Sequence, residues 1–381
     1  MATRARIRPS ELGLVEKLGQ LNWALIIVLG LLGLVGYLVL YSAGGGNHEP
    51  WAWRHGVRLA FGLCVMLAVA LIDIRFWFRW AYTFYAVAFV MLLGVEIVGE
   101  FSKGAQRWID LGLFQLQPSE LMKVGLVLCL ARYFHSAYLD EVKRLFFLAV
   151  PLAAIALPAV LVLKQPDLGT SVMLVACGGA LLFLAGVRLW KFGLAIGAVA
   201  AALPVAWAGL HDYQRQRVLT FLDPETDPLG AGYHIIQSKI ALGSGGFWGK
   251  GFLQGSQAQL SFLPEKQTDF AFTMLAEETG FVGALVVLLL CLVVVALSLI
   301  VALRCGHQFG RLLAMGIAVN FFLYVLINVA MVTGLIPVVG VPLPMISYGG
   351  TAMLTTLIGF GLVLSADVHH TTNIPRFPTD L

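Results

Sequence analysis

Long apolar stretches recur along the whole chain, and this feature constrains the fold more than any other. A helix of about 20 apolar residues crosses the hydrocarbon core of a bilayer, and the 381-residue chain contains ten stretches of this kind. They lie near residues 21–42, 55–73, 78–98, 118–135, 145–163, 168–186, 189–209, 281–303, 313–334 and 347–366. The sequence therefore predicts an all-α integral membrane protein, a polytopic bundle of ten transmembrane helices.

Composition agrees with this prediction and indicates one membrane domain, residues 1–381. Hydrophobic residues make up 59% of the chain and charged residues 12%, whereas about 25% are charged in a typical soluble domain. The apolar run that begins at Leu21 is too long for the core of a signal peptide. The five cysteines show no CxxC motif and no pairing pattern, so they predict neither a disulfide nor a metal site.

The placement of positive charge predicts the orientation, because cytoplasmic loops carry an excess of Lys and Arg. With the N-terminus inside, the short cytoplasmic segments hold fourteen Lys and Arg residues and the short outer segments hold five. An even number of spans then places both termini in the cytoplasm, as an N-terminal segment (1–20) and a tail (367–381). The long segment 210–267 becomes a large, partly helical extracytoplasmic loop, and loops of this length are usually functional.

A carboxylate stands where this loop meets the next apolar helix, in SFLPEKQTDFAFTMLAEETG (261–280). Thr268 suits a helix N-cap, and an Asp269 in the first helical turn would be favoured by the helix dipole. The stretch from Asp269 to Glu278 is not needed for the span that follows, so we expect it at the outer interface, where the carboxylates of Glu277 and Glu278 are tolerated. This local pattern fits a cap as well as a catalytic residue.

Two further polar stretches lie near the predicted outer face. In QPSELMK, Glu120 and Lys123 are three residues apart on one helix face, which predicts either a structural ion pair inside the bundle or a role at a substrate cavity. In KGAQRWIDLG, Lys103, Arg107 and Trp108 suit a phosphate-bearing lipid headgroup, although a Trp also serves as an interfacial anchor.

Three turn-like motifs complete this face. GSGGFWGKG (243–251) lacks the spacing of a phosphate-binding P-loop, so both a plain turn and a close backbone contact with a ligand stay open. KQPDLGT reads as a tight turn around Asp167, and GVPLPMISYGGT as a helix start with small residues for close packing. Since all these polar segments converge on one side of the membrane, they imply an outer site for an anionic, membrane-bound substrate.

The motifs together resemble a known family. KGAQRWIDLG, QPSELMK, KQPDLGT, GSGGFWGKG, FLPEKQTDFAF with LAEETGFVG, and GVPLPMISYGG follow one another here in the order typical of the SEDS family (shape, elongation, division and sporulation). The resemblance extends from about Leu21 to Asp367, with a departure at Gln267, where many relatives have His. It implies a peptidoglycan glycosyltransferase that polymerises lipid II on the outer face of the bacterial cytoplasmic (inner) membrane, with Asp269 as the catalytic residue.

The resemblance also implies partners: a class B penicillin-binding protein that supplies transpeptidation, other elongation-complex proteins and membrane lipid, with no nucleic acid. An inverting transfer to a sugar 4-hydroxyl needs one base, for which Asp269 is the candidate, and cations for the departing diphosphate. A bound divalent cation is left open, and no cofactor is otherwise expected. The candidate substrate-binding residues are Lys103, Arg107, Trp108, Glu120, Lys123, Lys239 and Lys250.

Three alternative functions stay open at this point. A lipid II flippase would show polar groups strung across the bilayer and inverted repeats with broken helices. The sequence shows one candidate ion pair near the outer end of the fourth span and no clear repeat. A non-enzymatic scaffold would leave Asp269 dispensable. A polymerase for division rather than elongation would share every motif above.

Overall fold

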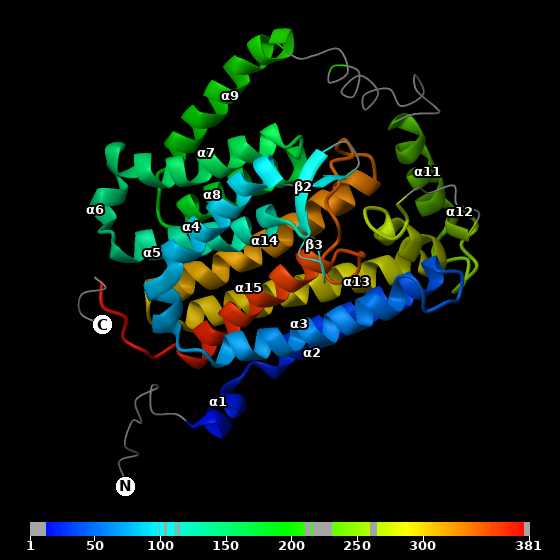
Figure 1. Ribbon diagram of the computed structural model, residues 1–381, viewed down its shortest axis with the longest axis horizontal. Coiled ribbons are helices and arrows are strands. Elements are labelled where there is room, and N and C mark those ends of the chain that lie inside the picture. The colour runs from blue at the N-terminus through cyan, green and yellow to red at the C-terminus, as the bar shows by residue number, and fades with distance from the viewer. Residues whose placement is uncertain are drawn as a thin grey trace.

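The computed structural model describes residues 13–98, 100–102, 105–110, 112, 115–209, 215, 231–259 and 265–376. Most of these residues form helices, and the longest run side by side along the long axis of the molecule (Figure 1). The first half contains α1 (Leu14–Gln20), α2 (Trp23–Ala43), α3 (Ala52–Leu71), α4 (Ile74–Val98), α5 (Pro118–Ser136), α6 (Leu139–Val142), a 3-10 turn (Phe146–Leu148), α7 (Ala149–Lys164), α8 (Leu168–Leu184) and α9 (Leu189–Gly209). The second half contains α11 (Ala231–Ser244), α12 (Ser256–Gln259), α13 (Ala271–Arg304), α14 (Gln308–Val332) and α15 (Gly350–Val368).

Seven of the described helices are long and apolar enough to cross a membrane, which confirms the prediction of a multi-pass helical bundle. They are α2, α3, α4, α7 with the preceding 3-10 turn, α13, α14 and α15. α8 and the apolar part of α9 are shorter, and α5 carries three charged residues, Glu120, Lys123 and Arg132. The count of ten spans therefore stays a prediction.

A small antiparallel sheet, which the sequence did not predict, interrupts the otherwise helical bundle. It has the order β1-β2-β3, formed by β1 (Glu100–Ser102), β2 (Ala105–Asp110) and β3 (Gln115–Leu116). Strand pairing supplies partners for the backbone N–H and C=O groups of a segment that has left one helix and not yet entered the next. Because α5 begins two residues after Leu116, the sheet fixes the end of the bundle where Glu120 lies.

Helix α15 lies at the centre of the bundle, and most of its side chains are buried. It packs against α3 along most of its length, through small residues that allow a close approach. A methyl group at Gly361 would come within 2.7 Å of the Met66 carbonyl oxygen, and one at Gly62 within 2.5 Å of the Leu357 side chain. The close approach of α3 and α15 therefore depends on Gly361, which meets backbone, whereas Gly62 meets only the end of a Leu side chain.

Helix α13 is broken at Gly280, which has φ 69° and ψ −167°. This break separates a first segment, Ala271 onward, from the apolar span. The sequence predicted that the stretch up to Glu278 is not needed for that span, but it did not predict the break. The glycine-rich segment 243–251 packs against the break: Lys250 N donates to Glu277 O, and Phe281 N donates to Gly246 O, each at 3.0 Å. A break in a helix leaves backbone N–H and C=O groups without partners in the helix. The backbone of segment 243–251 supplies hydrogen-bond partners for such groups on both sides of the break.

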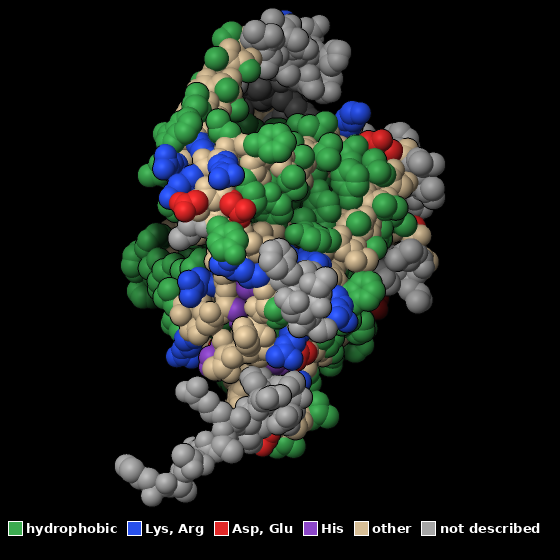
Figure 2. All heavy atoms as spheres, turned by 90° about the vertical axis from the view of Figure 1, so that its left-hand side faces the viewer, with side chains coloured by type: hydrophobic (Ala, Val, Ile, Leu, Met, Phe, Trp, Pro, Cys, Tyr) green, Lys and Arg blue, Asp and Glu red, His purple; other side chains and the backbone are tan. Residues whose placement is uncertain are grey.

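The described beginning and end of the chain lie at the same end of the bundle (Figure 1). Lys17 Nζ, on α1, donates to the Leu71 carbonyl at the end of α3, and Ser365 Oγ, near the end of α15, donates to the neighbouring Ile72 carbonyl. Lys and Arg side chains gather on this end of the molecule (Figure 2). Asp269 and the glycine-rich segment lie at the opposite ends of the same helices.

Candidate active site

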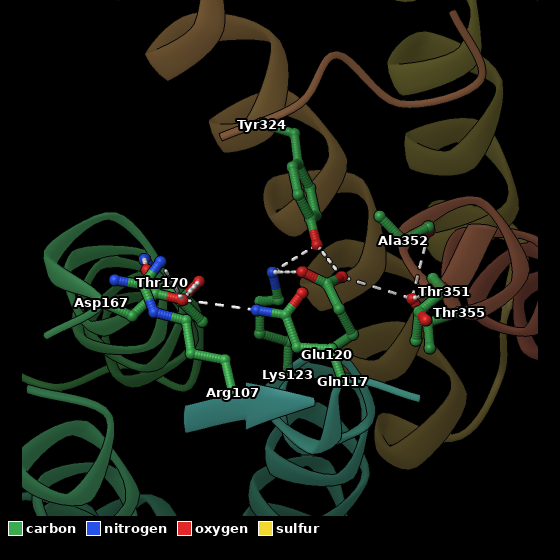
Figure 3. A network of polar contacts seen from close by, with 10 residues as sticks. All are labelled: Arg107, Gln117, Glu120, Lys123, Asp167, Thr170, Tyr324, Thr351, Ala352 and Thr355. Carbon is green, nitrogen blue, oxygen red and sulfur yellow. Dashed lines mark hydrogen bonds and ion pairs between the residues drawn. The ribbon is translucent and has the colours of Figure 1, made fainter. Parts of the chain in front are cut away.

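A buried polar cluster joins three helices through Glu120 and Lys123, near the start of α5. Lys123 Nζ donates to Glu120 Oε1 at 2.8 Å, and both side chains are at most 4% exposed. The Tyr324 hydroxyl, on α14, contacts both partners and donates to the other carboxylate oxygen of Glu120. Thr355 of α15 approaches that oxygen at 3.4 Å (Figure 3). The predicted ion pair inside the bundle is confirmed, and its role at a substrate cavity stays a prediction.

A second cluster adjoins the first through Gln117, whose Nε2 donates to Asp167 Oδ2 at 3.3 Å (Figure 3). Asp167 is the N-cap of α8, since its Oδ1 accepts from Thr170 N at 3.1 Å. This geometry confirms the turn predicted for KQPDLGT. Arg107, on β2, reaches the same turn: its Nε donates to the Gln165 carbonyl at 3.0 Å and its Nη1 lies 4.0 Å from Asp167 Oδ2. Arg107 therefore joins the sheet to the turn between α7 and α8.

Asp269 precedes helix α13 rather than beginning it, which corrects the predicted helix start. The N-cap is Phe270, with no side-chain cap, and the first turn contains no acidic residue. Thr268, the predicted cap, directs its hydroxyl back to Glu265, at 3.1 Å from Oε2. The sequence prediction failed because it assumed that the first Thr after the proline would start the helix. Asp269 is therefore neither the N-cap of α13 nor part of its first turn.

The backbone holds Asp269 in place from two sides. Asn328, on α14, donates through Nδ2 to the Asp269 carbonyl at 3.0 Å and to the Val341 carbonyl at 2.7 Å. Tyr348 N donates to the Gln267 carbonyl at 2.7 Å. A methyl group at Gly340 would lie 3.6 Å from Asp269 Oδ2, so the segment after α14 also passes beside the carboxylate. The half-buried Asp269 is thus fixed between α14 and the GVPLPMISYGG segment.

Helix α14 connects Asp269 with the Glu120 cluster. Asn320, Tyr324 and Asn328 follow one another at four-residue spacing, so they share one face of the helix. Tyr324 and Asn328 are at most 2% exposed and lie about 6 Å apart along the helix axis. The Glu120 cluster and Asp269 are therefore about one helical turn apart along α14, and together they form the candidate active site.

The other predicted substrate-binding residues lie around this centre with different partners. Lys250 Nζ contacts Glu277 Oε1 at 2.7 Å and Ser256 Oγ at 2.7 Å. Lys239 is exposed on α11, and its side chain lies against Gly334 at the end of α14. Trp108 is half-buried on β2, and Lys103 lies outside the described residues.

Sequence reasoning missed Tyr324 and Asn328, although one signal pointed to them. Polar side chains inside an apolar span usually face the bundle interior and bond to neighbouring helices. The four-residue spacing of Asn320, Tyr324 and Asn328 is such a signal. No comparable signal in the sequence pointed to Thr355 on α15, because Thr is common in apolar helices.

The side chains that could bind a metal ion are scattered in the part of the chain that the structure describes. There, no three His, Cys, Asp or Glu side chains lie close enough together to hold a metal ion. All five cysteines are free, and four of them are buried. The described residues therefore point to no metal ligands, and a divalent cation at the site stays untested.

The family model for the cell cycle proteins FtsW, RodA and SpoVE matches residues 17–372. The chain belongs to the SEDS family. It is 46% identical over 346 residues to the peptidoglycan glycosyltransferase MrdB of Escherichia coli K12, covering 91% of this chain and 92% of that protein.

Other relatives show the same family membership. The chain is 40% identical to the probable peptidoglycan glycosyltransferase FtsW of Idiomarina loihiensis, over 84% of this chain and 79% of that one. A chain from a peptidoglycan synthase complex that coordinates polymerization and crosslinking superimposes with a TM-score of 0.81 at 31% identity, covering 93% and 99% of the two chains. The rod shape determining protein RodA of Thermus thermophilus superimposes with a TM-score of 0.70 at 28% identity, covering 93% and 98%. The SEDS fold of this chain is thereby established.

Proposed function

We propose that this SEDS protein is a peptidoglycan glycosyltransferase that polymerises lipid II into glycan strands at the outer face of the inner membrane. The observation that carries the proposal is the 46% identity with the peptidoglycan glycosyltransferase MrdB over 91% of the chain. The geometry supports it, because Asp269 is held by Asn328 next to a buried polar cluster at one end of the bundle.

The proposed reaction is an inverting transfer in which Asp269 acts as general base. The 4-hydroxyl of one lipid-linked sugar attacks the anomeric carbon of the other, a new glycosidic C–O bond forms and the C–O bond to the diphosphate breaks. The hydroxyl proton passes to the Asp269 carboxylate, and the polyprenyl diphosphate leaves as an anion that needs cations rather than an acid. A divalent cation, if one takes part, would share the charge of the diphosphate with these cations.

The direct test is polymerisation by the purified protein in complex with its transpeptidase. We expect lipid II to be converted into glycan strands that a muramidase cleaves, and the strands should be resolved by gel electrophoresis. A protein that moves lipid II across a vesicle membrane and leaves it unpolymerised would instead be a flippase. No strand formation and no transport would point to a scaffold.

A role in elongation is proposed over a role in division. The chain is 46% identical to MrdB of Escherichia coli but 37% identical to the probable FtsW of another Escherichia coli strain. The superposition with a rod shape determining protein supports the same choice.

A class B penicillin-binding protein is the proposed partner, within an assembly of elongation proteins in the lipid bilayer. The outer face of α13 offers a surface for the single transmembrane helix of such a protein. Leu285, Leu289 and Leu292 recur at helical spacing and are 43–57% exposed. The similarity to a chain of a peptidoglycan synthase complex supports a partner of this kind.

The proposed topology is a single membrane domain with ten spans, both termini (1–20 and 367–381) in the cytoplasm and the loop 210–267 outside. The Lys and Arg side chains that gather on the end of the molecule with the termini support this orientation (Figure 2). Lys191 Nζ, on α9, donates to the carbonyl of Lys143, directly after α6, at 2.9 Å.

Single cysteines test this topology after the native cysteines have been replaced. Gln254→Cys, on the exposed segment before α12, should react with an impermeant maleimide added to intact spheroplasts. Arg144→Cys, between α6 and the 3-10 turn, should react only after the membrane is permeabilised. Both positions are exposed in the structure, so their labelling reports the side of the membrane on which they lie. Labelling of Arg144→Cys in intact spheroplasts, with Gln254→Cys labelled only after permeabilisation, would mean that the orientation is inverted.

A further inference from the structure

Arg58 is a cation near the start of a membrane-spanning helix. The helix is α3, one of the seven that can cross the membrane, and the side chain of Arg58 is half-buried. In the part of the chain that the structure describes, no carboxylate forms an ion pair with it. Charged side chains inside a membrane span are costly unless they are paired or bind a substrate. No described carboxylate therefore neutralises the charge of Arg58, so its guanidinium is available to a bound anion.

The guanidinium of Arg58 is held in a fixed place. Its Cζ lies 4.8 Å from the centroid of the Tyr348 ring, a cation–π contact. On α15, a methyl group at Gly350 would come within 3.1 Å of Cζ, Nε and Nη1, so the guanidinium lies directly against the backbone of Gly350. Stacking on a ring occupies the face of a guanidinium and leaves its N–H edge available to an anion. That edge matches the oxygens of a phosphate.

The residues that hold Arg58 also hold Asp269. Tyr348, which stacks on Arg58, donates its backbone N–H to the Gln267 carbonyl, two residues before Asp269. Gly340, in the same segment between α14 and α15, lies beside the Asp269 carboxylate. One short segment, residues 340–350, therefore connects the proposed base with the cation.

The described cations that the sequence predicted to bind a substrate are mostly engaged elsewhere. Arg107 bonds to the turn between α7 and α8 and to Asp167, and Lys250 pairs with the buried Glu277. Lys123 is enclosed by Glu120 and Tyr324. A departing diphosphate needs a cation whose charge is not already neutralised by a carboxylate. Arg58 meets this condition and contacts the segment beside Asp269.

We propose that Arg58 binds the diphosphate of the lipid-linked substrate, with Tyr348 and Gly350 orienting its guanidinium. The inference rests on the proposed function and adds a binding residue to it. The same chemistry would also suit the phosphate of a membrane phospholipid, so the experiment must separate the two sources.

The test compares Arg58→Ala and Arg58→Lys with a matched control, Arg54→Ala, an exposed arginine one helical turn away. The protein, in complex with its transpeptidase, is placed in nanodiscs of phosphatidylcholine alone or with phosphatidylglycerol. We expect Arg58→Ala to raise the KM for lipid II at least about tenfold, with a smaller change in kcat, because one charge-assisted contact is lost. Arg58→Lys should recover part of the affinity, and Arg54→Ala should match the wild type.

Direct binding of undecaprenyl diphosphate gives a second readout that does not depend on turnover. The wild type and Arg54→Ala should bind it with equal affinity, and Arg58→Ala at least about tenfold more weakly in both lipids. Equal binding by wild type and Arg58→Ala would overturn the inference even if polymerisation is normal. An effect confined to nanodiscs with phosphatidylglycerol would overturn it in favour of a phospholipid headgroup. If the wild type binds the diphosphate but makes no strands, the proposed function fails and the binding comparison still decides the role of Arg58.

Discussion

Asp269→Asn is expected to lower the rate of glycan polymerisation at least about a hundredfold, within the range that general base catalysis contributes, while the protein keeps its folding yield and melting temperature. The substitution preserves the size of the side chain and removes its ability to take a proton. The structure explains why the Asp269→Asn variant should be as stable as the wild type. Helix α13 has its N-cap at Phe270, one residue later, and Asn328 holds residue 269 through its backbone carbonyl.

The matched control is Asp140→Asn, which removes a charge from an exposed side chain paired with Lys143 at the opposite end of the bundle. It should polymerise lipid II at the rate of the wild type. Both variants should be assayed as folded complexes with the transpeptidase, so that a loss of partner binding is not mistaken for a loss of chemistry. A wild-type rate for Asp269→Asn would remove this residue from the mechanism and favour the scaffold.

The helices of this protein could be predicted from the sequence because membrane insertion depends on local composition. A stretch of about 20 apolar residues predicts a helix whatever it packs against. The same arithmetic indicated that the residues before Gly280 are not needed for the span that follows, but it did not predict the break in α13. The shorter α8 and the charged α5 depart from that pattern, because neighbouring helices rather than lipid surround much of their surface.

The start of α13 and the small sheet could not be predicted in this way. Thr268 has the chemistry of an N-cap, but its hydroxyl bonds to Glu265 and the helix begins at Ala271. A local pattern identifies residues able to cap a helix and does not choose among competing partners nearby. The strands β1 to β3 are short, and their pairing depends on chain reversals that periodicity does not reveal.

The partners of the site residues were the hardest part to predict, because they are distant in the sequence. Glu120 and Lys123 are neighbours on one helix, so their pairing was evident. Tyr324 contacts Lys123 and Glu120 across 201 and 204 positions, and Asn328 contacts Asp269 across 59 positions. Arg107 and Lys250 were expected to be available for a substrate, and each is bound to a partner that only the fold brings near.

Lys123→Met is expected to destabilise the protein by about 3 to 5 kcal/mol, the cost of leaving a buried carboxylate without its partner. Glu120 is 3% exposed, and after the substitution its charge would keep the hydroxyl contacts of Tyr324 and Thr355 but lose the ammonium group. Methionine fills a similar volume, so the loss should come from charge rather than from a cavity. The measurement is the midpoint of unfolding for the purified protein in detergent.

A double variant, Glu120→Gln with Lys123→Met, separates the charge from the packing. A neutral glutamine at position 120 can still bond to Tyr324, so the double variant should recover most of the stability that Lys123→Met alone loses, because replacing a buried ion pair by neutral groups is often nearly neutral. Lys143→Ala is the matched control, since Lys143 and Asp140 have the same three-residue spacing but are 47% and 87% exposed. It should leave the unfolding midpoint unchanged, because water screens an exposed pair.

The outcomes of this comparison distinguish an ion pair that joins helices from one that serves the substrate. If Lys123→Met proves as stable as the wild type, Glu120 must already be neutral or solvated, and the cluster would then hold a proton rather than an ion pair. If the double variant is stable but polymerises poorly, the pair acts on the substrate, and its role exceeds that of joining α5, α14 and α15.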